Sequence, residues 1–317
     1  MIAGIAPADW LIGMLGHDFI WHAFLAGTFI ALAAGLVGYF VVLRNQVFTG
    51  DALSHVAFTG ALAAFAIGIE ALIGLFSASI VGAVGMGALG SRARSRDVVV
   101  GVVFAWVLGL GVLFLSLYTT YRSTSHSTAG VSILFGSIYG ISLSQAAIAA
   151  AVGAGAALAL VVIARPLLFA SVDSDIAAAR GIPVRVVGMF FLALVGVTVA
   201  EAVQAVGALL IFGLMVTPAA AAHRLSARPY RALALSAALG VAALWLGLTL
   251  SYAFPRIPPS FCIVALAFGF YVAVVVRSAG LTAWSRRMPP ARSDRAPERP
   301  PRSGALPPGG IEPPSTG

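Results

Sequence analysis

Long apolar runs, separated by short polar or arginine-containing stretches, make up most of the chain. The first run covers residues 19–43, which is long enough to cross a bilayer core about 30 Å thick, because such a crossing takes about 20 helical residues. Eight further runs cover residues 52–69, 71–89, 98–117, 146–163, 184–200, 203–222, 232–250 and 261–276. None alternates like a barrel strand, so the pattern predicts an all-α polytopic membrane bundle of about nine spans.

The span count is least secure around Glu201. The two runs that flank this residue are short, which also fits a broken or re-entrant pair of helices. Before them, the stretch 119–144 opens with polar residues and continues into an amphipathic segment at 133–138, which we expect to form a surface or re-entrant helix.

Composition and charge agree with a membrane protein. Hydrophobic residues make up 60% of the chain and charged residues 9%, whereas soluble domains have about 25% charged residues. The net charge of +8 comes from arginines that lie between apolar runs, so we interpret them as topology signals and expect no nucleic-acid partner. The single cysteine, Cys262, allows no internal disulfide and no thiolate cluster.

The arginines divide unequally between alternate loops. One set of loops contains only Arg122 and Arg256, and the other contains Arg44, Arg92, Arg94, Arg96, Arg165, Arg180, Arg185, Arg224, Arg228 and Arg231. Because basic residues collect in cytoplasmic loops, we expect a multi-pass protein of the plasma membrane with its N-terminus outside and its C-terminus in the cytoplasm.

This pattern predicts a chain of three parts. Residues 1–18 form an extracytoplasmic N-terminal segment, and residues 19–277 form the membrane domain. Residues 278–317 are rich in Arg, Pro, Ser and Gly, so we expect a disordered cytoplasmic tail.

Within the membrane domain, residues 173–182 predict a short capped helix on the cytoplasmic side. Acidic residues stand at its start, alanines in its middle, and arginine followed by glycine at its end, which complements the helix dipole and stops the helix. The residues concerned are Asp173, Asp175, Ala177, Ala178, Arg180, Gly181 and Ile182.

Asp51 and His55 are the first candidates for chemistry. They lie four residues apart at the start of the second run, which places a carboxylate and an imidazole on the same face of a helix. Such a pair suits Zn, Mn or Fe(II) and disfavours Cu(I). Two ligands are too few for tight binding, which suits an ion that must leave, and others are expected from another helix or a second subunit. The structural alternative is an aspartate that caps the helix and pairs with His55.

Glu201 is the third candidate, because ionisable groups inside a membrane are costly unless they are paired, hydrated or metal-bound. Its carboxylate either contributes to an ion path or lies at a helix turn that faces outer water. The sequence contains no lysine and no Gly-rich phosphate loop, so this chain has no Walker A site and is expected to hydrolyse no ATP itself.

These stretches, taken together, resemble the permeases of zinc, manganese and iron ABC importers. The first matching stretch is 44–55, whose most specific part is Gly-Asp-Ala-Leu-Ser-His at residues 50–55. Weaker matches follow in the family's order at 133–138, 175–183, 206–210, 218–222 and 247–252. The resemblance covers residues 19–277. The chain departs from the family at Phe58-Thr59-Gly60, where a proline commonly precedes the glycine, and in the tail.

The resemblance implies a homodimeric permease that works with two ATP-binding cassette subunits and an extracytoplasmic metal-binding protein. It implies that Asp51 and His55 contact the metal in the translocation path, and that residues 173–182 form the coupling helix that docks on the ATPase. No permanently bound cofactor is implied, since the divalent metal is the cargo.

We therefore expect ATP-driven alternating access for a divalent transition-metal ion, with zinc, manganese and iron left open. One alternative is a permease for a metal chelate such as a siderophore or cobalamin, and another is a channel or secondary carrier. An intramembrane hydrolase that uses His55 with Ser54 or Asp51 is disfavoured, because one helical turn does not assemble a nucleophile, an oriented base and an oxyanion site.

Overall fold

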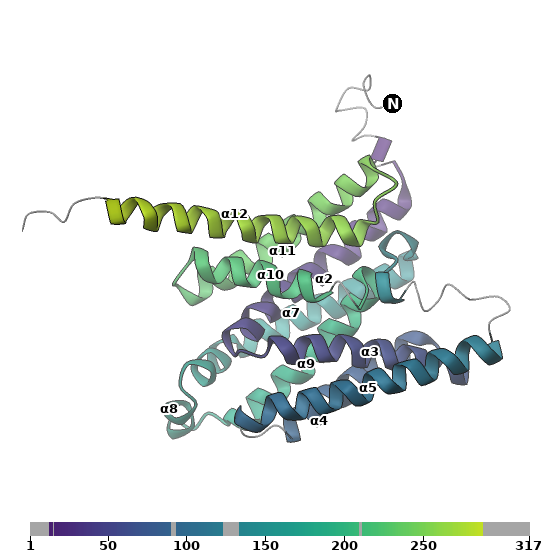
Figure 1. Cartoon of the computed structure of the whole chain (residues 1–317), viewed down its shortest axis with the longest axis horizontal. Helices are drawn as coiled ribbons and strands as arrows, with labels where there is room; N and C mark the ends of the chain where they lie inside the picture. Colours follow the sequence, from purple (N-terminus) through teal and green to yellow (C-terminus); the bar gives the residue numbers. More distant parts are fainter. Residues whose placement is uncertain (1–12, 15, 90–92, 123–132, 209–210, 288–317) are drawn as a thin grey trace, which may run out of the picture. The chain divides into compact units, whose positions relative to one another are not determined.

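The structure, a computed structural model, describes residues 13–14, 16–89, 93–122, 133–208 and 211–287 (Figure 1). Within these residues the chain is helical and contains no β-strand, which confirms the all-α class. The helices are α2 Asp18–Leu43, α3 Val47–Ile67, α4 Ala71–Leu89, α5 Ala93–Arg122, the 3-10 helix η1 Ile138–Gly140, α7 Leu143–Val172, α8 Ser174–Ala179, α9 Val184–Val206, α10 Ile211–Leu225, α11 Pro229–Ala253 and α12 Pro259–Arg287.

Eight of the described helices are long and apolar enough to cross a membrane, namely α2, α3, α4, α5, α7, α9, α11 and α12. The described residues therefore contain eight candidate spans, where the sequence predicted about nine. The run expected at 203–222 is divided, because α9 continues to Val206 and the rest of the run forms the 15-residue helix α10. At 1.5 Å per residue α10 is about 22 Å long, which is less than the bilayer core.

The short helix α10 nevertheless ends beside the last turns of α2. The ring of His223 stacks on the ring of Tyr39 with their centroids 4.4 Å apart and 6° between their planes. The His223 Nε2 also donates a hydrogen bond to the carbonyl oxygen of Tyr39 at 3.1 Å. The chain therefore returns toward the Arg44 loop through a short helix after a break at Gly207.

The segment 133–140, expected as a surface or re-entrant helix, packs into the bundle. Ile138 is buried, and the Tyr139 hydroxyl donates to the carbonyl oxygen of Leu248 on α11 at 2.9 Å. The backbone N–H of Ala208 donates to the carbonyl oxygen of Ile133 at 3.1 Å. The re-entrant alternative therefore fits better than a helix on the surface, although residues 123–132 lie outside the described part of the chain.

Two glycines permit this contact between the segment and the break after α9. Gly136 and Gly207 have φ angles of +76° and +97°, which residues with a side chain rarely adopt. A Cβ on Gly136 would lie 2.5 Å from the carbonyl oxygen of Ala205, and a Cβ on Gly207 would lie 2.6 Å from the backbone nitrogen of Gly136. The two backbones are thus in direct contact.

Helix α2 lies at the centre of one group of helices, in contact with α7, α9, α10 and α11. Small residues bring α11 close to it, since a Cβ on Gly35 would lie 2.7 Å from the Cα of Ala237. The Ser236 hydroxyl donates to the carbonyl oxygen of Gly35 at 2.6 Å. Such close backbone approach and interhelical hydrogen bonding are typical of packing in lipid.

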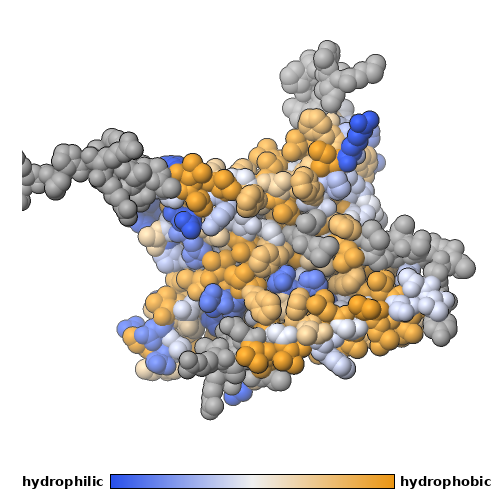
Figure 2. All heavy atoms as spheres, viewed as in Figure 1, coloured by the Kyte–Doolittle hydropathy of each residue, from blue (hydrophilic) through white to orange (hydrophobic). Residues whose placement is uncertain are grey.

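Helices α3, α4 and α5 form a second group. A Cβ on Gly74 of α4 would overlap the carbonyl oxygen of Gly60 on α3, so these helices also cross in backbone contact. Helix α5 is exposed along most of its length and presents Val102, Trp106 and Val112 outward. Figure 2 shows a largely apolar surface where α5 lies, as expected for a face turned to lipid or to another apolar surface.

The last described helix continues past the expected end of the membrane domain. Helix α12 runs to Arg287, so residues 278–287, which were assigned to the disordered tail, are helical. They contain no proline, and the first proline beyond them is Pro289, where a helix is expected to stop. The rest of the predicted tail, 288–317, and residues 1–12 of the N-terminal segment lie outside the described residues.

Candidate functional site

Asp51 and His55 both lie on α3, one turn apart as predicted. The helix begins after Gln46 and ends at Gly68, whose φ of 85° gives the left-handed C-cap that glycine adopts most easily. Both side chains are partly exposed, whereas Leu53 and Ser54 between them are buried. The pair therefore occupies the accessible face of a helix whose other face packs into the protein.

The imidazole of His55 is positioned by an aromatic ring of α5. The centroids of His55 and Phe104 are 5.1 Å apart, with an interplanar angle of 82°. Phe48, two turns before His55, also contacts Phe104, with a centroid distance of 5.8 Å. Helix α5 thus forms an aromatic wall beside the pair.

The contacts of Ser54 count against the hydrolase alternative. Its hydroxyl is fully buried and donates to the carbonyl oxygen of Asp51 at 2.7 Å. A nucleophile has to be accessible and close to a base, whereas this hydroxyl is engaged with its own helix backbone. The arrangement leaves Asp51 and His55 as the groups available to a ligand.

Thr59, where the family resemblance led us to expect a proline before Gly60, has a side chain that links two helices. The Thr59 hydroxyl donates to the carbonyl oxygen of Val107 on α5 at 3.1 Å, and Thr59 is buried. Helix α3 is continuous from Val47 to Ile67. This position therefore has a threonine that hydrogen-bonds α3 to α5, the helix that contains Phe104.

The structure does not bring Glu201 to Asp51 and His55. His55 packs against Phe104 of α5, whereas Glu201 lines a cavity with residues of α4 and α7. Among the described residues, no three His, Cys, Asp or Glu side chains are grouped as metal ligands.

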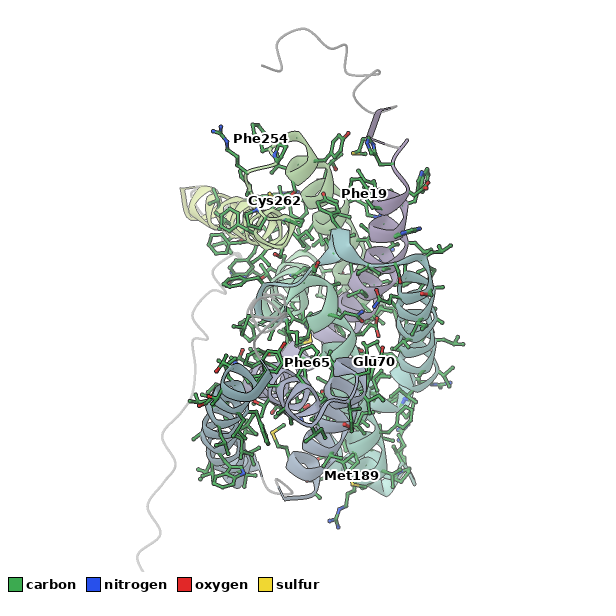
Figure 3. The ribbon with its side chains drawn as sticks, turned by 90° about the vertical axis from the view of Figure 1, so that its right-hand side faces the viewer. Phe19, Phe65, Glu70, Met189, Phe254 and Cys262 are labelled. Atoms are coloured by element: carbon green, nitrogen blue, oxygen red, sulfur yellow. The ribbon has the colours of Figure 1, made fainter. Side chains whose placement is uncertain are left out.

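Glu201 instead borders a cavity of its own. It is 3% exposed, and its Oε2 atom has no hydrogen-bond partner in the described structure. The cavity, of about 310 Å³, is also lined by Gln145 and Gln204, and it adjoins a second cavity of about 320 Å³ lined by the same two glutamines. Glu70 and Phe65 border the second cavity and lie at the same level in Figure 3.

The helix expected at 173–182 is present as α8. The carboxylate of Asp173 accepts hydrogen bonds from the backbone N–H groups of Asp175 and Ile176 at 3.0 and 2.9 Å, so it caps the helix. At the other end Arg180 is the C-cap residue and Gly181 has a φ of +79°. Ala177 is buried, while the charged residues of this segment are exposed.

Sequence reasoning missed Phe104 and Gln145 as neighbours of these candidates, and it gave no role to Gln204, which is close to Glu201 in the sequence. Phe104 is one of many apolar residues in a span, and no local signal distinguishes it. Gln145 and Gln204 were recognisable as amides at the edges of apolar runs, where polar side chains are uncommon. That they border the same cavities follows only from the packing of α7 against α9.

Known proteins resemble the chain over the region that contains these helices. The model of the family described as the ABC 3 transport family matches residues 16–278. The manganese import system permease protein ScaB of Streptococcus parasanguinis is 28% identical over 83% of this chain and 92% of its own length. A Haemophilus influenzae protein named "Probable iron transport system membrane protein" is 28% identical over 85% of this chain and 97% of its own.

A solved structure shares the fold. PsaBC from Streptococcus pneumoniae, solved in complex with a Fab, superposes with a TM-score of 0.73 at 27% identity and covers 85% of this chain and 95% of that chain. A transporter of proposed metal-chelate type, in an inward-facing conformation, has a TM-score of 0.60 at 17% identity, which shows the fold alone.

Proposed function

Because the chain belongs to the ABC 3 transport family, we propose that it is the permease of an importer that carries manganese or iron ions into the cell. The chain is a multi-pass membrane protein and a component of an ABC transport system, without an ATPase domain of its own. The proposal of manganese or iron is supported by the names of similar proteins, which are manganese and iron transport systems. These names do not mention zinc, the third metal expected from the sequence.

The observation that carries the proposal is the pair Asp51 and His55. A carboxylate oxygen and an imidazole nitrogen, one turn apart on a partly exposed helix face, give a weak two-ligand site for Mn or Fe(II). A transported ion needs such weakness, because each contact must be released again. In a homodimer, the same pair of a second copy would complete the coordination.

Orientation and partners form the next part of the proposal. Helix α10 also returns the chain to the side of the Arg44 loop, where His223 contacts Tyr39, so with the arginine-rich loops in the cytoplasm the N-terminus lies outside and the C-terminus inside. An ATP-binding cassette subunit then docks on the cytoplasmic α8, and an extracytoplasmic metal-binding protein delivers the ion on the other side. A rigid capped helix between α7 and α9 suits the transmission of ATP-driven closure to these two spans.

Glu201 is not a third ligand of the pair in this proposal. Its cavity lies between α4, α7 and α9, whereas His55 faces α5. We assign the ion path to the face that α3 and α5 share, and we keep Glu201 as a separate buried carboxyl group.

The test is uptake of radiolabelled manganese, iron and zinc by cells that lack their own importers and express this chain with its ATPase and binding protein. We expect accumulation of manganese or iron that disappears with His55→Ala and with Asp51→Ala. The matched control is His22→Ala, which removes a partly exposed histidine in the first turns of α2 and should leave uptake unchanged.

Two outcomes would contradict the proposal. Wild-type uptake by both site variants would remove Asp51 and His55 from the mechanism. An assembled complex that hydrolyses ATP but accumulates only a metal chelate would establish the chelate permease instead.

A further inference from the structure

A cavity of about 250 Å³ lies where the end of α7 meets α8. Arg165, Pro166 and Phe169 of α7 line it together with Arg180 and Ile182. Two guanidinium groups from different elements therefore reach one cavity, and no carboxylate is among these lining residues. Within the described part of the chain, neither the Arg165 nor the Arg180 guanidinium group has a hydrogen-bond or ion-pair partner.

The cavity continues an apolar stripe on the outer face of α7. Ile148, Leu158, Val162 and Phe169 are all exposed, and Val162 is 71% exposed. They recur at helical spacing on one side of α7, which is the side expected to face lipid. Arg165 interrupts this stripe and is its first charged residue.

The depth of Arg165 matches the surface of a bilayer. It follows Leu143, the first residue of α7, by 22 positions in the sequence, which corresponds to about 33 Å of helix. A hydrocarbon core is about 30 Å thick, so an arginine at this point reaches the headgroups. The contact of Ser171 with Arg44 puts this end of α7 on the side of the arginine-rich loops.

We propose that this cavity binds the headgroup of an anionic phospholipid of the cytoplasmic leaflet, with its phosphate between Arg165 and Arg180. Guanidinium groups form strong, geometrically specific hydrogen bonds to phosphate. The acyl chains of the same lipid would lie along the apolar stripe of α7, so one molecule satisfies both the charged cavity and the apolar face. Basic pockets between membrane helices recognise lipid headgroups in this way.

The bound lipid would hold the end of α8. Arg180 is the C-cap residue of this helix, and both Arg180 and Ile182 line the cavity. A lipid that bridges Arg180 to Arg165 therefore fixes the position of α8 relative to α7. This consequence rests on the proposed docking of the ATPase on α8, whereas lipid binding itself does not.

Lipid binding is tested with the assembled transporter in nanodiscs of phosphatidylcholine that contain a small fraction of fluorescent phosphatidylglycerol. Energy transfer to a label on the permease reports the lipid next to it. We expect the apparent affinity for phosphatidylglycerol to fall about tenfold in the double variant Arg165→Gln/Arg180→Gln, because two charge-assisted contacts are lost. The control Arg231→Gln removes an exposed arginine outside the cavity and should change the affinity less than twofold.

Each alternative gives a different result. Wild-type affinity for phosphatidylglycerol in the double variant would overturn the proposal. If the double variant releases the ATPase subunit while lipid binding is unchanged, the arginines bind an acidic surface of that subunit. If inorganic phosphate displaces phosphatidylglycerol from the wild type at equal concentration, the cavity is a site for free phosphate. A permease that binds lipid as expected but imports no metal would contradict the proposed function alone.

Discussion

The imidazole ring of His55 meets the ring of Phe104 edge to face, with the two centroids 5.1 Å apart. This contact joins the helix that carries the candidate ligands to α5, which is exposed along most of its length. It follows that α5 fixes the orientation of His55, although α5 contributes no ligand of its own to the pair.

Replacing Phe104 by alanine should weaken transport without abolishing it. The aromatic wall beside His55 is lost, so the imidazole samples other rotamers, and we expect uptake at low metal concentration to fall about fivefold, equivalent to about 1 kcal/mol. Concentration-dependent metal uptake measures the effect. Trp106→Ala, which removes an exposed ring of the same helix, is the control. Equal losses in both variants would show a general effect on α5.

Glu201→Gln should retain metal uptake within about threefold of the wild type. The substitution keeps the size of the side chain, and the cavity of Glu201 is separate from the face that bears His55. Uptake is compared at equal amounts of protein in the membrane. A loss as complete as that of His55→Ala would place this carboxyl group in the ion path.

Gly74→Ala should destabilise the protein by about 1–3 kcal/mol, because the new Cβ overlaps the backbone of Gly60. Thermal unfolding in detergent should show a lower Tm. Gly85→Ala lies on the same helix with nothing within 4 Å of the new Cβ, so it should be neutral or stabilising by up to about 1 kcal/mol. If the two variants unfold alike, α3 and α4 do not cross in backbone contact.

Asp173→Ala should impair the coupling of ATP hydrolysis to transport. The substitution removes the acceptor for two N–H groups at the start of α8, which costs about 1 kcal/mol of helix stability. We expect less metal transported per ATP hydrolysed, measured in proteoliposomes. Asp173→Asn keeps a capping oxygen and should behave like the wild type. Equal impairment of both variants would mean that the charge matters and the cap does not.

The spans were predictable because, in lipid, the length of an apolar run nearly determines the helix. The run 71–89, for example, coincides with α4. The spacing of Asp51 and His55 was equally informative, since four residues on a helix specify one face whatever surrounds them. Local composition also identified α8, whose cap uses only neighbouring residues.

Hydropathy allowed a broken pair of helices near Glu201, but it did not place the break at Gly207, after the end of α9. Residues 203–222 are largely apolar, but Gly207 adopts a φ of +97° because its backbone lies against Gly136. That contact joins residues far apart in the sequence. The wall beside His55 and the cavity of Glu201 were unpredictable for the same reason, since both arise where different helices pack.

The contact between Gly136 and Gly207 also constrains how the protein is made. During synthesis Ile133 leaves the ribosome well before Ala208. The backbone N–H of Ala208 is the donor to the carbonyl oxygen of Ile133, so this hydrogen bond forms late. Until α9 has entered the membrane, the segment 133–140 therefore lacks the backbone against which it packs. The first four spans and α7 therefore insert into the membrane before the segment 133–140 can pack. The segment reaches its final position only after the second half of the chain has been inserted.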